Sequence, residues 1–338
     1  MMQEPPQVSV VIPTCDRRGV LARCLSSLVS QTHASFEIIV VDDGSVDDTP
    51  VFLQAFADEH PGLRFCWLRN EERLGANPSR NRGIREAAGE FVAFIDSDCA
   101  AAEDWLERLM HGFSSERVGA VTGLVRDPLP TNIYELTFKG THRLGRPGAA
   151  RRLVGGNMCI RRELLLEYPL DEDLKHSCDE EGVFLRLRAG GYEQRVVPEA
   201  VVDHEHYYTR QSFFRQARQG SESAARLVYK YYLPQRLDML PFMLAYASLP
   251  LILADVRLAA APGFFFAAAL AAIAYNDLFR KGKTIGETLR SFPVLLAYYH
   301  VRLCGYIVET IRLRLCRHGL RRVRLDKAPD AAPDASAG

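Results

Sequence analysis

Short apolar segments alternate with helical patterns through the first 95 residues of this chain. Each apolar segment is largely continuous, which is typical of strands buried on both faces of a sheet: residues 8–13, 36–41, 63–68 and 91–95. Residues at helical spacing lie between them, at about 20–30, 48–59 and 78–88. Strands and helices in this order need right-handed crossovers, so the series predicts an α/β fold with a mostly parallel sheet.

Polar or acidic residues follow three of these strands. The sequences at the strand ends are Pro13-Thr14-Cys15-Asp16, Asp42-Asp43-Gly44-Ser45 and Asp96-Ser97-Asp98. In open parallel sheets, ligands bind beyond the carboxyl ends of the strands. We therefore expect these residues to line one binding edge of the sheet.

The third strand end, Asp96-Ser97-Asp98, has two interpretations. If the extended backbone continues, its period of two puts Asp96 and Asp98 on one face, where a hard divalent cation relieves the repulsion between the carboxylates. The alternative is a solvated turn that caps the following helix. The two other polar strand ends, and an acid-rich segment about eighty residues later, favour the metal site.

Composition and motifs argue against several other classes of protein. The 338 residues include 42 basic and 42 acidic side chains, so the net charge does not favour nucleic acid. The eight cysteines lack CxxC or Cys/His ligand spacing, which fits reduced cytosolic thiols better than disulfides or zinc. The first strand–helix turn lacks GxGxxG, the chain has no P-loop motif, and its N-terminus does not resemble a signal peptide.

Three segments occur in a recognisable order: VSVVIPTCDRRGVLARCLSSL, FEIIVVDDGSVDDT and GANPSRNRGIREAAGEFVAFIDSD. Together they resemble the donor half of family 2 glycosyltransferases with the GT-A fold, and the resemblance extends over about residues 7–230. It implies a Rossmann-like domain that binds a nucleotide sugar. It also implies that Asp42 or Asp43, with Thr14 and Asp16 nearby, contacts the nucleobase and ribose of the donor.

The same resemblance implies how the donor diphosphate is held. Arg80 is expected near the diphosphate or the base, and Asp96 and Asp98 are expected to form the DXD motif that holds Mg or Mn on it. His204 resembles a family histidine near the metal or the diphosphate, with His206 as a weaker candidate. A histidine that follows a strand also often makes only structural hydrogen bonds.

The acceptor half is expected to carry the catalytic base. Residues 170–192 resemble the family segment with this base, and its pair of acids falls on Asp179 and Glu180 in inverted order. We favour Glu180, then Asp179, with Glu181 third, although acids are also favourable at a helix N-terminus. Asn157 is a candidate polar contact for a ligand, whereas the two glycines before it also fit an ordinary β-bulge.

The C-terminal third is apolar and basic. The stretches 240–254, 258–275 and 292–308 fit a short transmembrane hairpin, helices lying in the membrane interface, or a soluble helical bundle. Basic flanking residues favour a membrane with the ends on the cytosolic face. We expect a GT-A domain at 1–232, with its donor half at 7–100 and acceptor half at 101–232. A helical region at 233–325 and a disordered tail at 326–338 follow.

These observations predict an inverting, metal-dependent glycosyltransferase at the cytoplasmic face of the cell membrane, or alternatively in the cytoplasm. Its donor would be a UDP-, GDP- or dTDP-sugar, and its acceptor a lipid-linked or surface glycan. The chain lacks the Gln-x-x-Arg-Trp motif of processive synthases, which favours a single transfer. Two alternatives are a catalytically impaired GT-A scaffold protein and a sugar-1-phosphate nucleotidyltransferase.

Overall fold

The computed structural model describes residues 4–139, 147–174, 179–205, 208–231 and 260–315, together with residues 233, 244, 323 and 325. The chain forms two compact units. The first comprises Met1–Pro128, Leu144–His206 and Leu325–Gly338, and the second comprises Leu129–Arg143 and Tyr207–Arg324. The sequence suggested a boundary after residue 232, whereas the structure already includes the long helix before that point in the second unit.

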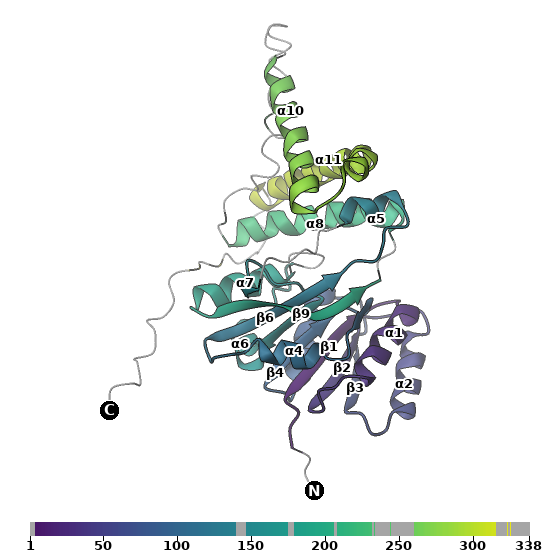
Figure 1. Ribbon diagram of the computed structural model, residues 1–338. Helices are drawn as coiled ribbons and strands as arrows, with labels where there is room; N and C mark the ends of the chain where they lie inside the picture. Colours follow the sequence, from purple (N-terminus) through teal and green to yellow (C-terminus); the bar gives the residue numbers. More distant parts are fainter. Residues whose placement is uncertain are drawn as a thin grey trace, which may run out of the picture. The chain divides into compact units, whose positions relative to one another are not determined.

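The first unit is built on a sheet whose N-terminal part is parallel (Figure 1). Its strands are paired in the order β3-β2-β1-β4, with bounds Phe65–Arg69, Phe36–Asp42, Val8–Thr14 and Phe91–Ile95. Three helices connect them, α1 (Arg18–Val29), α2 (Thr49–Glu59) and α3 (Ala76–Glu86). The predicted alternation of four strands and three helices is thus confirmed.

Beyond β4 the sheet is mixed, which corrects the expectation of a mostly parallel sheet. Strand β8 (Asn157–Arg161) is antiparallel to both β4 and β6 (Val118–Arg126), and β9 (Glu193–His204) is parallel to β6. Two short strands, β5 (Cys99–Ala101) and β7 (Gly148–Ala149), are antiparallel to β9. The physical reason is the connection: parallel neighbours need a long crossover, and the regular helix–strand alternation that supplies one ends at β4.

Both faces of the sheet are buried. Strand residues pack alternately on the two sides: Val8, Val10 and Ile12 lie in one apolar cluster, while Val11, Ile39 and Val41 lie in the other. Helix α1 contributes Leu21, Leu25 and Leu28 to the first cluster, as its helical spacing predicts. Three further helices belong to this unit, α4 (Trp105–His111), α6 (Arg162–Glu167) and α7 (Asp179–Ala189).

The second unit is helical. It contains α5 (Ile133–Phe138), α8 (Arg210–Lys230), α10 (Ala260–Tyr275), the π-helix η3 (Asn276–Arg280) and α11 (Ile285–Leu315). Helices α8 and α11 pack together, and a 2.8 Å ion pair joins Arg226 to Glu309. Among the described residues, none of the helices combines the length and apolar character that crossing a bilayer requires. The expected tail at 326–338 and nearly all of the apolar stretch 240–254 lie outside the described residues.

Candidate active site

The carboxyl ends of β1, β2 and β4 meet at one edge of the sheet, as the sequence predicts. Thr14 pairs in register with Asp42, and β4 lies on the other side of β1. The three polar strand ends therefore lie along the same edge of the first unit (Figure 1).

Asp96 and Asp98 are separated by a turn, not by an extended strand. The backbone N–H of Cys99 donates to the carbonyl of Asp96 at 2.9 Å, so the chain bends to enter β5. The expectation of two carboxylates on one strand face is therefore wrong. The pairing of β5 with the end of β9 requires this bend, because β9 is separated from β4 by two other strands.

Asp96 is held on one side of this turn by Arg80. The guanidinium Nη2 of Arg80 donates to Asp96 Oδ1 at 2.7 Å; the Arg80 side chain is 4% exposed and that of Asp96 is 35% exposed. A Cβ atom at Gly156 would lie 2.7 Å from Asp96 Oδ2. Gly156 therefore makes room for this carboxylate, which gives one of the two glycines noted in the sequence a specific role.

Asp98 lies on the other side of the turn, between two cationic side chains. Arg17 Nη1 donates to Asp98 Oδ2 at 2.6 Å, and His204 Nε2 lies 3.6 Å from Asp98 Oδ1. The other ring nitrogen of His204 lies 3.8 Å from Asp127 Oδ1. Burial disfavours the charged imidazole, but hydrogen bonds to Asp127 and Asp98 outweigh it and raise the pKa of His204 to about 9.

This arrangement fits a divalent cation. Asp98, Cys99 and His204 bring one ligand atom each to within 4.8 Å of one another. Carboxylate oxygen suits Mn²⁺ or Mg²⁺, and His204 would have to release the proton that Asp98 and Asp127 stabilise on it before its imidazole nitrogen could bind the cation. Burial, reinforced by the nearby Asp96 carboxylate, raises the pKa of the Cys99 thiol well above its usual range, so the thiol stays protonated and is a poor ligand. Of the three residues expected to hold the cation, Asp98 and His204 lie in this group, whereas Asp96 lies outside it and pairs with Arg80, so its role as a ligand stays a prediction.

Asp43 is part of a buried hydrogen-bond network. Its Oδ1 accepts from Asn70 Nδ2 at 2.7 Å, Leu74 N at 2.9 Å and Ser79 Oγ at 3.1 Å, and its Oδ2 accepts from Gly75 N at 2.8 Å. The carboxylate thereby fixes the loop between β3 and α3. Its predicted contact with a donor nucleotide stays a prediction.

Asp42 and the end of β1 are also held by protein groups. Asp42 is fully buried and accepts from Ser45 N at 3.1 Å. Asp16 has a positive φ of 50°, accepts from Val46 N at 2.7 Å and pairs with Arg73. Thr14 Oγ1 is buried and has no hydrogen-bond partner within the described part of the chain. Asp42 Oδ2 likewise has no hydrogen-bond partner within that part, and Arg69 Nε lies 3.6 Å from it. Of these side chains, Thr14 and Asp42 therefore retain a polar atom, and Asp16 an exposed surface, for a ligand.

Asn157 has a structural role, which corrects its expected role as a ligand contact. Its Oδ1 accepts from Trp105 Nε1 at 2.8 Å, and its Nδ2 donates to the carbonyls of Leu124 at 3.0 Å and Ala200 at 2.9 Å. The side chain is completely buried. It joins α4 to three adjacent strands because β8 lies between β4 and β6, a placement that the sequence pattern did not reveal.

The candidate bases lie at the start of α7. This helix begins at Asp179, and Glu180 and Glu181 are half-buried in its first turn. The orientation of the Asp179 side chain, residues 175–178 and His206 lie outside what the structure describes. The choice among the three acids therefore stays a prediction, and their position also fits the alternative of acids at a helix N-terminus.

Sequence reasoning missed Arg17 and Asp127. Arg17 follows Asp16 directly and was not considered as a partner for Asp98. Asp127 follows the last residue of β6, so the signal used elsewhere, an acid at the end of a buried strand, also marks it.

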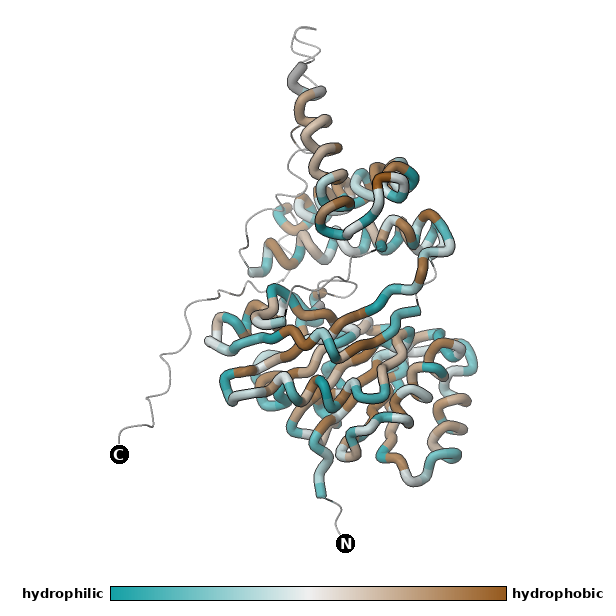
Figure 2. The backbone as a smooth tube through the Cα atoms, in the orientation of Figure 1, coloured by the Kyte–Doolittle hydropathy of each residue, from teal (hydrophilic) through white to brown (hydrophobic). Residues whose placement is uncertain are grey.

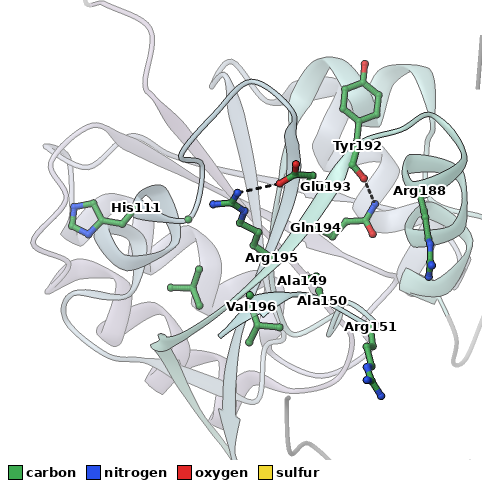
Figure 3. Close-up of a pocket in the computed structure, with 13 residues that line it drawn as sticks. His111, Ala149, Ala150, Arg151, Arg188, Tyr192, Glu193, Gln194, Arg195 and Val196 are labelled. Carbon is green, nitrogen blue, oxygen red and sulfur yellow. Dashed lines mark hydrogen bonds and ion pairs between the residues drawn. The ribbon is translucent and has the colours of Figure 1, made fainter. Parts of the chain in front are cut away.

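A separate cavity lies at the N-terminal end of β9, the end away from His204 (Figure 3). Its volume is about 1030 Å³, and its lining includes Arg151, Arg188, Tyr192 and Arg195. Arg195 pairs with Glu193 at 3.1 Å across the strand surface. The lining contains none of the residues at the carboxyl edge, so this cavity does not coincide with the candidate site.

Comparison with known proteins finds a family match within the N-terminal half of the chain. Residues 9–168 match the family described as glycosyl transferase family 2. The chain is 35% identical over 127 residues to glycosyltransferase AglE of Haloferax volcanii, covering 37% of this chain and 41% of the relative. It is 34% identical over 105 residues to a GalNAc(5)-diNAcBac-PP-undecaprenol beta-1,3-glucosyltransferase of Campylobacter jejuni, covering 31% of this chain and 34% of the relative.

Solved structures support the same fold. The mannosyltransferase PcManGT from Pyrobaculum calidifontis, in complex with GDP-Man and Mn²⁺, aligns with a TM-score of 0.61 at 22% identity, covering 90% of this chain and 88% of that one. The chain spans only about two fifths and one third of the two curated relatives, so the likeness establishes the domain and not a specific substrate. Residues 9–168 thus match glycosyl transferase family 2, and the fold is that of the GT-A glycosyltransferases.

Proposed function

We propose that this protein is an inverting, metal-dependent glycosyltransferase that moves one sugar from a nucleotide-sugar donor to an acceptor hydroxyl. The observation that carries the proposal is the convergence of Asp98 and His204 next to the Arg80–Asp96 pair at the carboxyl edge of the sheet. A bound Mg²⁺ or Mn²⁺ would supply positive charge for the departing nucleoside diphosphate. The pair of ligands in PcManGT, GDP-Man and Mn²⁺, is of the proposed kind.

The residues at this edge have distinct proposed roles. Asp98, His204 and the adjacent Asp96 would hold the cation. Arg80 is almost fully buried, so it orients Asp96, whereas Arg17 is 48% exposed and has room to contact the donor diphosphate. Thr14 and Asp16 would face the nucleoside part of the donor.

The proposed base is Glu180, with Asp179 and then Glu181 as alternatives. It would accept the proton of the acceptor hydroxyl as this oxygen attacks the anomeric carbon from the face opposite the leaving group. General base catalysis contributes about 10²–10⁴ in rate. Glu180→Gln should therefore lower kcat by about that factor while donor affinity is kept, and Glu163→Gln, at an exposed glutamate in the first turn of α6, is the matched control. Unchanged turnover in Glu180→Gln would move the base to Asp179.

The donor can be identified by measuring turnover with a panel. Purified protein is incubated with UDP-, GDP- and dTDP-sugars plus Mn²⁺ or Mg²⁺, and slow donor hydrolysis is followed as release of nucleoside diphosphate. We expect release from one nucleotide class, and its loss on addition of EDTA. A protein that binds nucleotide sugars without turnover would be the scaffold alternative. Release of pyrophosphate from a nucleoside triphosphate plus a sugar 1-phosphate would indicate the nucleotidyltransferase.

We also propose that the second unit associates with the cytoplasmic face of a membrane. Helix α10 is apolar on all sides (Figure 2), and Phe264 is 69% exposed. A helix of this kind is typical of an apolar environment. Its 16 residues extend about 24 Å, less than the ~30 Å of a bilayer core, so these residues would enter the bilayer without crossing it. The exposed Arg280 and Arg290 would contact anionic headgroups.

Membrane association can be measured by sedimentation with vesicles. We expect binding to vesicles that contain anionic lipid and weaker binding in Phe264→Asp. Val51→Asp, at an exposed position of α2 in the first unit, is the matched control. Equal binding of both variants would argue against insertion of α10. A membrane-bound enzyme would suit a lipid-linked or surface-glycan acceptor, and the Campylobacter relative is named for an undecaprenol-linked substrate.

A further inference from the structure

Helix α3 contacts two parts of the first unit that are far apart in sequence. Toward the sheet edge, Ser79 Oγ donates to Asp43 at 3.1 Å and Arg80 donates to Asp96 at 2.7 Å. From the same helix, Asn77 and Asn81 bind the segment 170–174. These two asparagines are one helical turn apart and both are buried, at 0% and 4% exposure.

Asn77 connects the buried arginine to this segment. Its Nδ2 donates to the carbonyl of Asp171 at 2.8 Å and to that of Leu174 at 3.3 Å. Its Oδ1 accepts from Arg80 Nη1 at 3.5 Å. A continuous set of contacts therefore leads from the carboxylate of Asp96 to residues 171 and 174.

Asn81 holds the same segment with three hydrogen bonds. Its Oδ1 accepts from Leu170 N at 2.9 Å, and its Nδ2 donates to Leu170 O at 2.8 Å and to Glu172 Oε1 at 2.9 Å. A primary amide can donate and accept at once without burying a charge. The two buried amides thus supply hydrogen-bond partners to backbone groups of residues 170, 171 and 174, which lie in a loop outside the sheet.

The segment 170–174 leads directly into the helix that carries the candidate base. Helix α7 starts five residues after Leu174, with Glu180 in its first turn. Since catalytic groups must be placed to within a fraction of an ångström, an anchor this close in sequence affects where Glu180 lies.

We propose that Asn77 and Asn81 are positioning residues, which fix residues 170–174 to α3 so that the base-carrying helix α7 is held in place relative to the donor edge. This inference rests on the proposed function, in which α7 carries the base. Helix α3 would then position both halves of the reaction: Arg80 orients Asp96 at the donor, and the two asparagines orient the acceptor side.

The test exchanges hydrogen-bonding character at Asn81. Asn81→Asp removes the donor to Leu170 O and places a carboxylate against Glu172, so kcat should fall by about 10²-fold while donor KM changes less than about twofold. Glu172→Gln alone should be near wild type, because its amide oxygen still accepts from Asn81. The double variant should recover about tenfold in kcat over Asn81→Asp, because a glutamine at 172 can donate to the new carboxylate.

Hydrogen exchange supplies a readout that needs no substrate. Peptides covering residues 170–174 and the start of α7 should exchange faster in Asn81→Asp, while peptides of the adjacent sheet keep their protection. Arg85→Gln, which changes charge equally at an exposed site of α3, is the matched control. If Asn81→Asp does not fold, Asn81→Ser, which removes the amide without adding charge, replaces it with the same expectations for kcat, donor KM and hydrogen exchange, and the double variant, which needs the carboxylate, is then omitted.

Three results would overturn the inference: an unchanged kcat in a folded Asn81 variant, a rise in donor KM that accounts for the whole loss, or no recovery in the double variant. Failure of the proposed function looks different, because the wild-type protein itself would then be inactive with every donor.

Discussion

The ends of β2 and β4 each carry two aspartates, but the carboxylate of Asp43 contacts different kinds of groups from those of Asp96 and Asp98. Asp43, after β2, is 7% exposed and accepts hydrogen bonds from neutral groups: two backbone amides, an asparagine and a serine. Asp96 and Asp98, after β4, instead contact cationic side chains, namely Arg80, Arg17 and His204.

This difference separates structural acids from candidate catalytic acids. Neutral donors fixed in a loop have no better partner than the carboxylate they surround, so the Asp43 network stabilises the loop after β3. A carboxylate paired with a half-exposed guanidinium, such as Asp98 with Arg17, can exchange that partner for a metal ion or a phosphate at small cost. Substituting Asn for Asp at each position tests the distinction with one change of chemistry.

Asp98→Asn should have the largest effect, and it should act on catalysis. The amide cannot supply the negative charge that holds a divalent cation, which contributes several kcal/mol to transition-state stabilisation, so kcat should fall by at least ~10²-fold. The free energy of unfolding should change by less than about 1 kcal/mol, because the Arg17 side chain is 48% exposed and regains water when the ion pair is lost. Initial rates with Mn²⁺ and urea unfolding measure the two quantities.

Glu90→Gln is a suitable control, since it also removes an acid from an ion pair, with Arg161, away from the edge. If Asp98→Asn kept its turnover and lost stability, Asp98 would belong with Asp43 as a structural acid, and the comparison would be wrong.

The elements of the donor half could be predicted from sequence because their local patterns and their tertiary environment agree. The run 36–41 is apolar except for Glu37 and lies fully within β2, and Leu21, Leu25 and Leu28 lie on the buried face of α1. Strand β5 was not predictable, because Cys99-Ala100-Ala101 becomes a strand only through pairing with β9, more than 100 residues later. The antiparallel placement of β8 was missed for the same reason.

The site was predictable in residue identity more than in geometry. Acids at strand ends marked Asp96 and Asp98, and His204 was expected near them, as it lies. The turn at Ser97, the partner Arg17 and the buried role of Asn157 depend on contacts across the sheet, which no local pattern encodes. A polar residue in a strand is equally consistent with a ligand contact and with a satisfied core hydrogen bond.

Asp43→Asn should have an intermediate effect, and it should act on stability. The asparagine amide can take two orientations. In one, its NH₂ group faces the Gly75 N–H, and in the other it faces the three donors around the present Oδ1. Either orientation leaves at least one buried donor without an acceptor. The free energy of unfolding should fall by about 1–3 kcal/mol. Turnover per folded molecule should stay within about threefold of wild type. Urea unfolding gives the first quantity, and rates corrected for folded fraction give the second.

The opposite result would be informative here. Unchanged stability together with a raised donor KM would make Asp43 a nucleotide contact, as the family resemblance implies. The buried network would then not be the reason that an aspartate is needed at this position.

Asp16→Asn should have the smallest effect, and it sharpens the comparison because Asp16 contacts both kinds of partner: the Val46 amide and the Arg73 guanidinium. The backbone hydrogen bond from Val46, together with Arg73, lowers the pKa of Asp16 below its ordinary 3.8. Because this pKa is lowered by folding, the ionised carboxylate stabilises the folded protein above a pH of about 3.8. This stabilisation disappears as the pH falls through the lowered pKa.

An asparagine keeps the acceptor for Val46 and tolerates the positive φ, so only the charge is lost. The Tm of wild type should therefore exceed that of Asp16→Asn slightly at pH 7, and the two should converge between pH 4 and 2 when followed by circular dichroism. A Tm difference that stayed constant over this range would show that the ionised carboxylate contributes nothing beyond the hydrogen bond, and Asp16 would then be held in the manner of Asp43.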